Sequence, residues 1–568
     1  MATTFGRRWR FLEAEHRQLV GWVADAASVP EGDPTARYHV HSSRAASKPV
    51  IALVSIVMVT VACAGSLDPA AEDTPRSAPA TSPSATGRAS GPHRPNIVRI
   101  LTDDQDMSSL PIMKKTQALL TARGVTYSNA VVSLSLCCPS RATLLTGQYA
   151  HNHHVWDNGG QTGGYAHFDD AGNSLAPWLH NAGYQTAHVG KYMNAYSKAD
   201  VAQVPAGWDD WFNVVDEARE SYPYFGYTIS DNGIGHKYGN ADADYITDVF
   251  ADRAIADLQK IDRTGTPFFL DYWPTAPHSG NGRIPSNHLG PVPPPEYEDA
   301  NPGVQAPRTA NFLPPDAANQ IPKGLLNYAG VYRSAAGGAA AFPALIDASY
   351  RDYLNSLLSV DDSVERIVNE LEASGQLDNT VIIFMSDNGL MWGNHGLAAM
   401  KWEPYEESLH VPLIITGPGF PAGVTTDRTV ANIDIVPTML QIAGATAGRT
   451  MDGTSLVPDI GGSVDATHDK DRGILIESNM YDPGQPLQFR GYHVPRFKGV
   501  RTAGFQYTEW ADGTIELFDL RADPAEMHNL AQEPAHADDR ARLAAGLVKL
   551  DSCAGIGCRV DIHGLTGT

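Results

Sequence analysis

The densest group of potentially reactive side chains is the run at residues 137–141 (CCPSR), which continues into residues 145–147 (LTG). Thiol and hydroxyl groups are candidate nucleophiles, arginine is a permanently charged ligand for tetrahedral oxyanions, and proline restricts the backbone between them. A helix predicted over residues 140–147 would place Cys137 near a helix N-terminus, where partial positive charge favours an anion. The alternative is a loop that starts a helix and contains a disulfide or buried thiols.

Two pairs of oxygen-bearing side chains follow predicted buried strands. Residues 96–102 (NIVRILT) end at the pair Asp103-Asp104, and residues 381–385 end just before the pair Asp387-Asn388. In open α/β sheets, ligands gather beyond the carboxyl ends of the strands. Hard oxygen donors suit Ca²⁺ or Mg²⁺ and not zinc, so the two pairs together indicate one divalent cation site. Either pair taken alone could equally be a solvated turn or a helix cap.

Two lysines and several histidines are further candidates. Lys191 follows a predicted strand over residues 184–190, Lys401 lies in the run KWEPYE, and His278 ends the run WPTAPH. A lone lysine is often an ordinary surface residue, and a lone histidine is usually structural. The run HNHHVWDN at residues 151–158 lacks histidines at helical i, i+4 spacing with an acid. We therefore favour packing on the substrate face over metal ligation for these histidines.

The elements that must position these residues alternate between apolar strands and amphipathic helices. Residues 279–345 are rich in Pro, Gly, Asn and Ala, and predict an irregular insertion over the strand ends that could shape a substrate pocket. The predicted strands of this region are residues 96–102, 184–190, 267–272, 381–385 and 411–416, and the predicted helices are 113–123, 140–147, 346–371 and one that Asp434 caps.

Taken in order, these motifs resemble the type I sulfatases over about residues 95–550. The string C-x-P-S-R followed by x-x-x-L-T-G resembles the family signature, whose first cysteine is oxidised to formylglycine. The strand-end acidic pairs, the lysine in G-K-Y and the K-x-x-x-Y-E string resemble further family motifs. The combination C-C-P-S-R, H-N-H-H and G-K-Y-x-N is most similar to the N-acetylglucosamine-6-sulfatase branch. One position departs from the family pattern, because Met193 stands where many relatives have a histidine.

The resemblance implies an α/β protein with an alkaline-phosphatase-like mixed sheet flanked by helices. It also implies hydrolysis of a sulfate ester of a sugar or aryl alcohol. One hydroxyl of the hydrated formylglycine would attack sulfur and the other would expel sulfate, a last step that a plain thiol cannot take. The implied catalytic residues are Cys137 as the modified nucleophile, Arg141, Lys191 and Lys401 as sulfate ligands, and His278 as proton donor to the leaving alcohol. The resemblance also implies a divalent cation, Ca²⁺ before Mg²⁺. Its implied ligands are Asp103, Asp104, Cys137 as formylglycine, Asp387 and Asn388.

Implied partners and competing functions follow from the same motifs. The partners are a small-molecule or glycan sulfate ester and, transiently, a formylglycine-generating enzyme. Phosphonate monoester and phosphodiester hydrolases share the modified cysteine, but they tend to lack the lysine at position 191 and to have histidine where Asn388 stands. A non-catalytic, sugar-binding surface lipoprotein is the alternative of another class.

Composition limits the range of functions. The 568 residues include 64 Asp and Glu against 42 Lys and Arg, a formal net charge of −22, which argues against a nucleic-acid binder. Five cysteines are too few for a disulfide scaffold. We predict a catalytic domain over residues 95–458 and a smaller α+β domain over residues 459–568. In the smaller domain we expect strands at 474–477, 499–502, 505–509 and 514–519, a helix at 535–550, and a small disulfide between Cys553 and Cys558.

The amino-terminal residues predict export. Residues 49–63 form a short apolar run after basic residues, as in a signal peptide, and end in TVAC, which resembles a bacterial lipobox. Lipidation of Cys63 would attach the chain to the outer face of a membrane, whereas a plain secretory signal would release it. Residues 64–94 are rich in Ala, Pro, Ser and Thr and predict a flexible tether. Residues 1–48 form an extension without an evident role.

Overall fold

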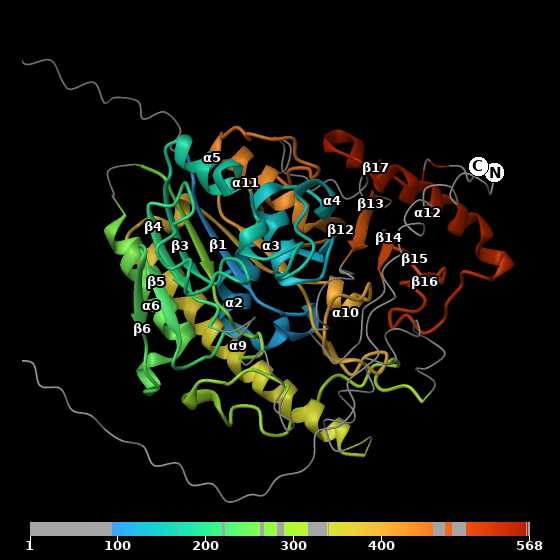
Figure 1. Ribbon diagram of the computed structural model, residues 1–568, viewed down its shortest axis with the longest axis horizontal. Helices are drawn as coiled ribbons and strands as arrows, with labels where there is room; N and C mark the ends of the chain where they lie inside the picture. The colour runs from blue at the N-terminus through green and yellow to red at the C-terminus, as the bar shows by residue number, and fades with distance from the viewer. Residues whose placement is uncertain are drawn as a thin grey trace, which may run out of the picture. The chain divides into compact units, whose positions relative to one another are not determined.

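A ten-stranded mixed sheet forms the centre of the protein, with strand order β12-β2-β11-β8-β1-β7-β3-β4-β5-β6 (Figure 1). The computed structural model describes residues 94–169, 171–217, 222–261, 266–280, 289–315, 338, 340–457, 472–479, 496–563 and 565. The strands are β1 (Asn96–Thr102), β2 (Gly124–Val131), β3 (Gln185–Gly190), β4 (Asp210–Val214), β5 (Thr228–Asp231), β6 (Ile234–Lys237), β7 (Phe268–Trp273), β8 (Thr380–Ser386), β11 (Leu413–Thr416) and β12 (Val424–Ala431).

The central strands are apolar on both faces because helices cover both sides of the sheet. Every residue of β1, β7 and β8 is buried, which is typical of parallel strands in α/β proteins. β1 pairs in parallel with both β7 and β8, and Thr102 lies opposite Ser386 at the end of the second pairing. The acidic pairs that follow these two strands therefore emerge side by side at the carboxyl edge of the sheet.

Two helical layers enclose the sheet. One apolar cluster joins the sheet to α6 and α9, and a second joins the opposite face to α3, α5 and α11 (Figure 1). The helix predicted over residues 346–371 is confirmed as part of α9. The helices are α2 (Lys114–Leu119), α3 (Cys137–Thr146), α4 (Ala150–His153), α5 (Leu175–Asn181), α6 (Ile246–Lys260), α9 (Phe342–Ala373), α10 (Glu406–Leu409), α11 (Ile435–Ala443) and α12 (Ala537–Leu550).

A smaller antiparallel sheet with strand order β16-β15-β14-β13-β17 follows the large one in the chain and packs beneath α12. The four predicted strands are present, and a fifth, short strand closes the sheet. The strands are β13 (Arg472–Ser478), β14 (Phe497–Arg501), β15 (Phe505–Trp510), β16 (Ile515–Asp519) and β17 (Val560–Asp561). A separate pair, β9 (Met391–Trp392) and β10 (Ala398–Met400), lies in the loop after β8.

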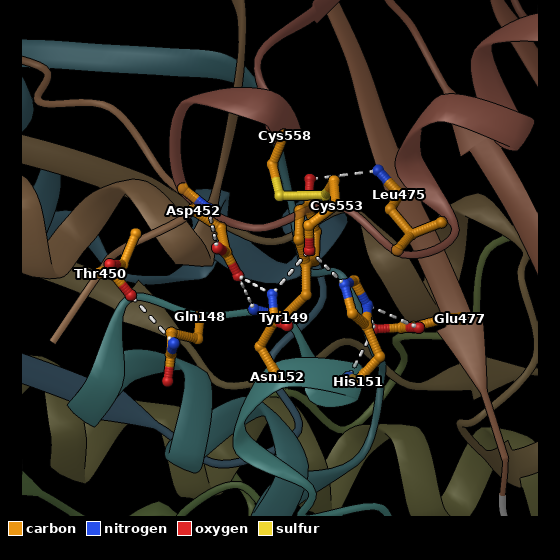
Figure 2. Close-up of a disulfide and its surroundings, with 11 residues drawn as sticks. Gln148, Tyr149, His151, Asn152, Thr450, Asp452, Leu475, Glu477, Cys553 and Cys558 are labelled. Carbon is orange, nitrogen blue, oxygen red and sulfur yellow. Dashed lines mark hydrogen bonds and ion pairs between the residues drawn. A yellow bond between two sulfur atoms is a disulfide. The ribbon is translucent and has the colours of Figure 1, made fainter.

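The predicted disulfide between Cys553 and Cys558 is present, and it closes a loop that contacts α4 (Figure 2). The carbonyl oxygen of Cys553 accepts hydrogen bonds at 2.9 Å from His151 and from Asn152, both in α4. His151 also contacts Glu477 of β13 at 3.0 Å. These contacts join residues that lie more than 300 positions apart and hold the small sheet against the segment that follows the CCPSR run.

Three sequence predictions need correction. The helix expected from residue 140 begins at Cys137, because the first turn of a helix tolerates proline, which has no N–H to donate. The helix expected over residues 113–123 is interrupted: α2 ends at Leu119, and a separate 3-10 turn follows. Asp434 is the N-cap residue of α11 as predicted, but its side chain makes no capping hydrogen bond there; the carboxylate forms a buried ion pair with Arg472 at 2.7 Å.

The remaining predictions fall outside the described residues or are untested. The signal segment at 49–63 with Cys63, the extension at 1–48 and nearly all of the tether at 64–94 lie outside them, as does much of the insertion at 279–345. The boundary predicted after residue 458 also falls in a stretch that the structure does not describe, so the two-domain division stays a prediction. Among the described helices, none is both long and apolar enough to cross a membrane.

Candidate active site

Cys137 is the first residue of α3 and lies at the centre of the site. Leu136 precedes it in an extended conformation, and the first helical hydrogen bond runs from the Ser140 N–H to the Leu136 carbonyl at 3.0 Å. The Sγ atom of Cys137 lies 3.3 Å from Asp103 Oδ1 and 2.9 Å from Lys401 Nζ. Burial, together with the nearby charge of Asp103, raises the pKa of the Cys137 thiol well above its usual value. As an unmodified cysteine this residue would be neutral at neutral pH and a poor nucleophile.

The predicted metal ligands converge beside Cys137. Asn388 Nδ2 donates to Asp104 Oδ1 at 2.7 Å, and the Asp104 N–H donates to Asp387 Oδ1 at 3.2 Å. Ligand atoms of Asp103, Asp104, Cys137 and His278 all lie within 4.8 Å of one another. His278 was not predicted to be near the cation, and this proximity is an addition to the expected set.

The donor set fits a hard divalent cation. Asn388 Oδ1 is buried and makes no hydrogen bond to any described residue, although a buried amide oxygen normally has a partner. Three carboxylates and an amide oxygen are the donors that Ca²⁺ and Mg²⁺ prefer. Burial and the adjacent charge of Asp103 raise the pKa of Asp387 to about 6, and a bound cation would counter that repulsion.

Three cationic side chains surround the same carboxylates. Arg141 is fully buried, with Nε 2.7 Å from Asp387 Oδ2 and Nη2 3.4 Å from Asp103 Oδ2. Lys191, at the end of β3, places Nζ 2.5 Å from Asp103 Oδ2. Lys401 pairs with Asp104 from the loop after β10. Burial opposes ionisation of Asp103, but the charges of Lys191, Arg141 and Lys401 hold its pKa well below the usual range.

His278 lies in the loop after β7 and faces the carboxylates. Its Nε2 is 3.7 Å from Asp104 Oδ2, and its Nδ1 donates to the Ser279 carbonyl at 2.8 Å. Burial lowers the pKa of His278 to about 4, so the ring is neutral at neutral pH. The Nδ1 contact leaves Nε2 unprotonated and directed toward the site. In that state His278 must receive a proton at Nε2 before it can donate one.

The structure brings together every residue predicted for the site, from segments spread across about 300 positions. The HNHH histidines are not among them: His151 contacts Glu477, and His153 Nε2 lies 3.1 Å from Thr143 Oγ1, so both pack in the structure. Met193 is buried with its sulfur 3.5 Å from Cys138 Sγ, which makes Cys138 a packing residue beside the site. These contacts agree with packing for His151 and His153, whereas His154 is exposed. None of the contacts bears on a substrate face.

Two aromatic residues of the site were not predicted. The Trp273 ring lies near two guanidinium groups, with its centroid 5.0 Å from Arg141 Cζ and 4.9 Å from Arg99 Cζ. The Tyr222 ring centroid lies 4.5 Å from Lys191 Nζ. Trp273 directly follows the strand predicted over residues 267–272 and is the last residue of β7. That position was the available signal, but an aromatic residue next to a strand is usually core, and only the fold shows the cations near it.

Comparisons with known proteins identify the family. A family model described as Sulfatase matches residues 95–445, and one described as N-sulphoglucosamine sulphohydrolase, C-terminal, matches residues 393–552. N-acetylglucosamine-6-sulfatase of Homo sapiens is 34% identical over 513 residues, covering 83% of this chain and 87% of that protein. N-acetylglucosamine-6-O-sulfatase of Bacteroides thetaiotaomicron is 27% identical over 513 residues, covering 79% and 85%.

Solved structures support the fold. A protein in complex with its substrate D-glucosamine-2-N,6-O-disulfate superposes with a TM-score of 0.66 at 24% identity, covering 81% of this chain and 97% of that one. The phosphonate monoester hydrolase of Agrobacterium radiobacter superposes with a TM-score of 0.64 at 24% identity, covering 81% and 95%. The predicted alkaline-phosphatase-like α/β fold is confirmed. The chain belongs to the sulfatase family of sulfuric ester hydrolases and is similar to its N-acetylglucosamine-6-sulfatases.

Proposed function

We propose that this sulfatase hydrolyses the sulfate ester of a sugar, with Cys137 converted to formylglycine and one Ca²⁺ held by Asp103, Asp104, Asp387 and Asn388. The observation that carries the proposal is the ring of three buried cations, Arg141, Lys191 and Lys401, around a buried cysteine at a helix N-terminus. Such an arrangement binds a tetrahedral oxyanion. The named sugar sulfatases at 27% to 34% identity support a sugar as the alcohol portion.

The modified residue and the cation supply what the cysteine lacks. Hydrated formylglycine offers one hydroxyl to attack sulfur and a second to release sulfate, and a divalent cation favours the ionised form of such a hydroxyl. The Cys137 thiol, kept neutral by burial, cannot supply this chemistry. A formylglycine-generating enzyme is therefore a required, transient partner.

The side chains around position 137 have separable tasks. Arg141, Lys191 and Lys401 hold the sulfate oxygens and offset the charge that develops on them. Nη2 of Arg141 lies 3.4 Å from Asp103 Oδ2 but makes no hydrogen bond to a described residue, so it can donate one to a sulfate oxygen. Asp387, adjacent to Arg141 at 2.7 Å, accepts the proton of the attacking hydroxyl. His278 Nε2, after it takes up a proton, delivers it to the leaving alcohol oxygen.

The second candidate function is hydrolysis of phosphonate monoesters or phosphodiesters. The phosphonate monoester hydrolase named above shares the fold. Lys191 and Asn388 favour sulfate, because members of the phosphonate group tend to lack this lysine and to use histidine at the Asn388 position. A sugar-binding lipoprotein without catalysis is the third alternative.

Steady-state rates on matched esters decide between these functions. We expect a higher kcat/KM for an aryl sulfate than for the aryl phosphonate with the same leaving group, and activity on N-acetylglucosamine 6-sulfate. A reversed preference would assign the protein to the phosphonate hydrolases. Hydrolysis of neither ester by protein whose Cys137 is modified would favour the non-catalytic alternative, as would equal rates in wild type and Cys137→Ala.

Export is part of the proposal. The disulfide between Cys553 and Cys558 supports it, because disulfides persist in oxidising compartments outside the cytoplasm. We infer that residues 49–63 direct export and that lipidation of Cys63 attaches the protein to the outer face of the membrane. Fractionation of cells tests this: wild type should be in the membrane fraction and Cys63→Ala should not. Retention of unprocessed protein in the cytoplasm would contradict export.

A further inference from the structure

A cavity lies beside the small antiparallel sheet, and none of its described lining residues belongs to the active site. It has a volume of about 430 Å³ and is bounded by the β14–β15 hairpin, the turn after β16, α12 and the segment after β17. Its lining includes Arg521, Arg542 and His563, and among the described residues that line it none is acidic. In a chain with a formal net charge of −22, two guanidinium groups on one cavity are a local concentration of positive charge, of which Asp539 offsets part at Arg542.

Both guanidinium groups have defined positions. The guanidinium group of Arg521 lies against Gly504: a Cβ atom added to this glycine would come within 2.8 Å of Nη1 and 2.9 Å of Cζ of Arg521. The turn that carries Arg521 is itself held by the Leu520 N–H, which donates to the Gly504 carbonyl at 2.9 Å. Arg542 pairs through Nη2 with Asp539, one turn earlier in α12. Its other N–H groups donate no hydrogen bond to a described residue. Positioned donors lose less conformational entropy when they bind an anion.

Three apolar side chains, Phe505, Leu543 and Ile562, contribute to the lining, which Thr502 and Gly504 complete. Leu543 and Ile562 are almost completely buried, with 2% and 3% of their surface exposed, and Phe505 is half-buried at the rim. A sugar ring presents C–H groups that pack against such surfaces, while sulfate and carboxylate substituents match the fork of an arginine. The volume is within the range of small-molecule sites, which runs from about 300 to 1,000 Å³. A charged sugar unit therefore fits both the chemistry and the size of the cavity.

We propose that this cavity is a second binding site for an anionic sugar unit, one that bears sulfate or carboxylate and belongs to a glycan chain. The class of ligand rests on the proposed sugar sulfatase function, whereas the location rests on the cavity alone. When one unit of a glycan chain is bound here, the other units of that glycan have a raised effective concentration at the active site. The site would thus favour polymeric over monomeric sulfate esters.

Binding of a size-defined heparin octasaccharide to the full chain tests the proposal. Titration calorimetry would use Cys137→Ala, which cannot turn the ligand over, as the parent protein. We expect the double variant Arg521→Gln/Arg542→Gln to raise Kd by about tenfold for each guanidinium lost. Lys549→Gln is the matched control, because Lys549 is an exposed cation of α12 outside the cavity, and its Kd should equal that of the parent. Thermal melting would verify that each variant is folded.

Three outcomes would overturn the proposal. The first is an unchanged Kd in the double variant. The second is an equal loss of affinity in Lys549→Gln, which would indicate general electrostatic attraction. The third is equally tight binding of single-stranded DNA of similar charge, which would indicate that the site does not recognise the sugar. Hydrolysis of N-acetylglucosamine 6-sulfate by wild type is measured separately. Hydrolysis without octasaccharide binding refutes this site alone, whereas binding without hydrolysis refutes the proposed function alone.

Discussion

Arg141 should be indispensable for turnover beyond its contribution to stability, and replacement by lysine tests this. Lysine keeps the positive charge but loses the planar fork, so it cannot contact both Asp387 and the Lys191 carbonyl, as Arg141 does. Loss of one charge-assisted hydrogen bond costs about 1.5–3 kcal/mol in the free energy of unfolding. Loss of a donor to the reacting sulfate should in addition lower kcat by about 10²- to 10³-fold.

Arg99→Lys is the matched control. Arg99 is also fully buried, its Cζ lies 4.9 Å from the Trp273 centroid against 5.0 Å for Arg141, and it contacts Asp271 through two bonds of 2.7 Å. It does not contact Cys137 or the metal-binding carboxylates in the described structure. Urea unfolding should show similar losses of stability in the two variants, whereas kcat/KM on an aryl sulfate should fall steeply only in Arg141→Lys. Equal losses of kcat/KM in both variants, or full activity in Arg141→Lys, would refute the assigned role.

Three further predictions concern a thiol, a carboxyl and the cation. Cys138→Ala should retain formylglycine at position 137 and turnover, because burial raises the pKa of Cys138 to about 12 and keeps it neutral; lost turnover in folded protein would contradict this. Burial raises the pKa of Glu516 from 4.5 to about 7, so the folded state holds its proton more tightly. The free energy of unfolding should therefore fall by about 3 kcal/mol as pH rises from about 4.5 to 7. Urea unfolding should show this loss reduced in Glu516→Gln but not in the exposed control Glu533→Gln; an unchanged pH dependence would be evidence against it. A chelator should abolish activity and Ca²⁺ restore it, and Asn388→Ala should raise the Ca²⁺ concentration needed for half-maximal rate; activity that survives chelation would argue against a required cation.

The sequence predicted those features whose causes are local. Apolar strands that end in acidic pairs, the amphipathic helix within α9 and the closely spaced Cys553 and Cys558 are each determined by short stretches of chain. The start of α3 was placed three residues late because Pro139 suggested a boundary, although proline is tolerated within the first turn.

Contacts between residues far apart in the chain could not be predicted from one sequence. Asp434 looked like a helix cap, but its partner Arg472 lies 38 positions away, and His151 meets Glu477 across 326 positions. The contacts of Trp273 with two guanidinium groups likewise depend on how three separate segments pack. Such pairs follow from the tertiary fold, and no local pattern of residue types encodes them.

The most direct test of the central claim is the mass of the tryptic peptide 124–141 from protein that hydrolyses a sulfate ester. Trypsin cleaves after Arg123 and Arg141, so this peptide contains Cys137. We predict a peptide whose mass is lower by the difference between a CH₂SH and a CHO group, and turnover in proportion to its abundance across preparations made with and without a formylglycine-generating enzyme. Full turnover by protein that contains only the unmodified thiol at position 137 would contradict the account.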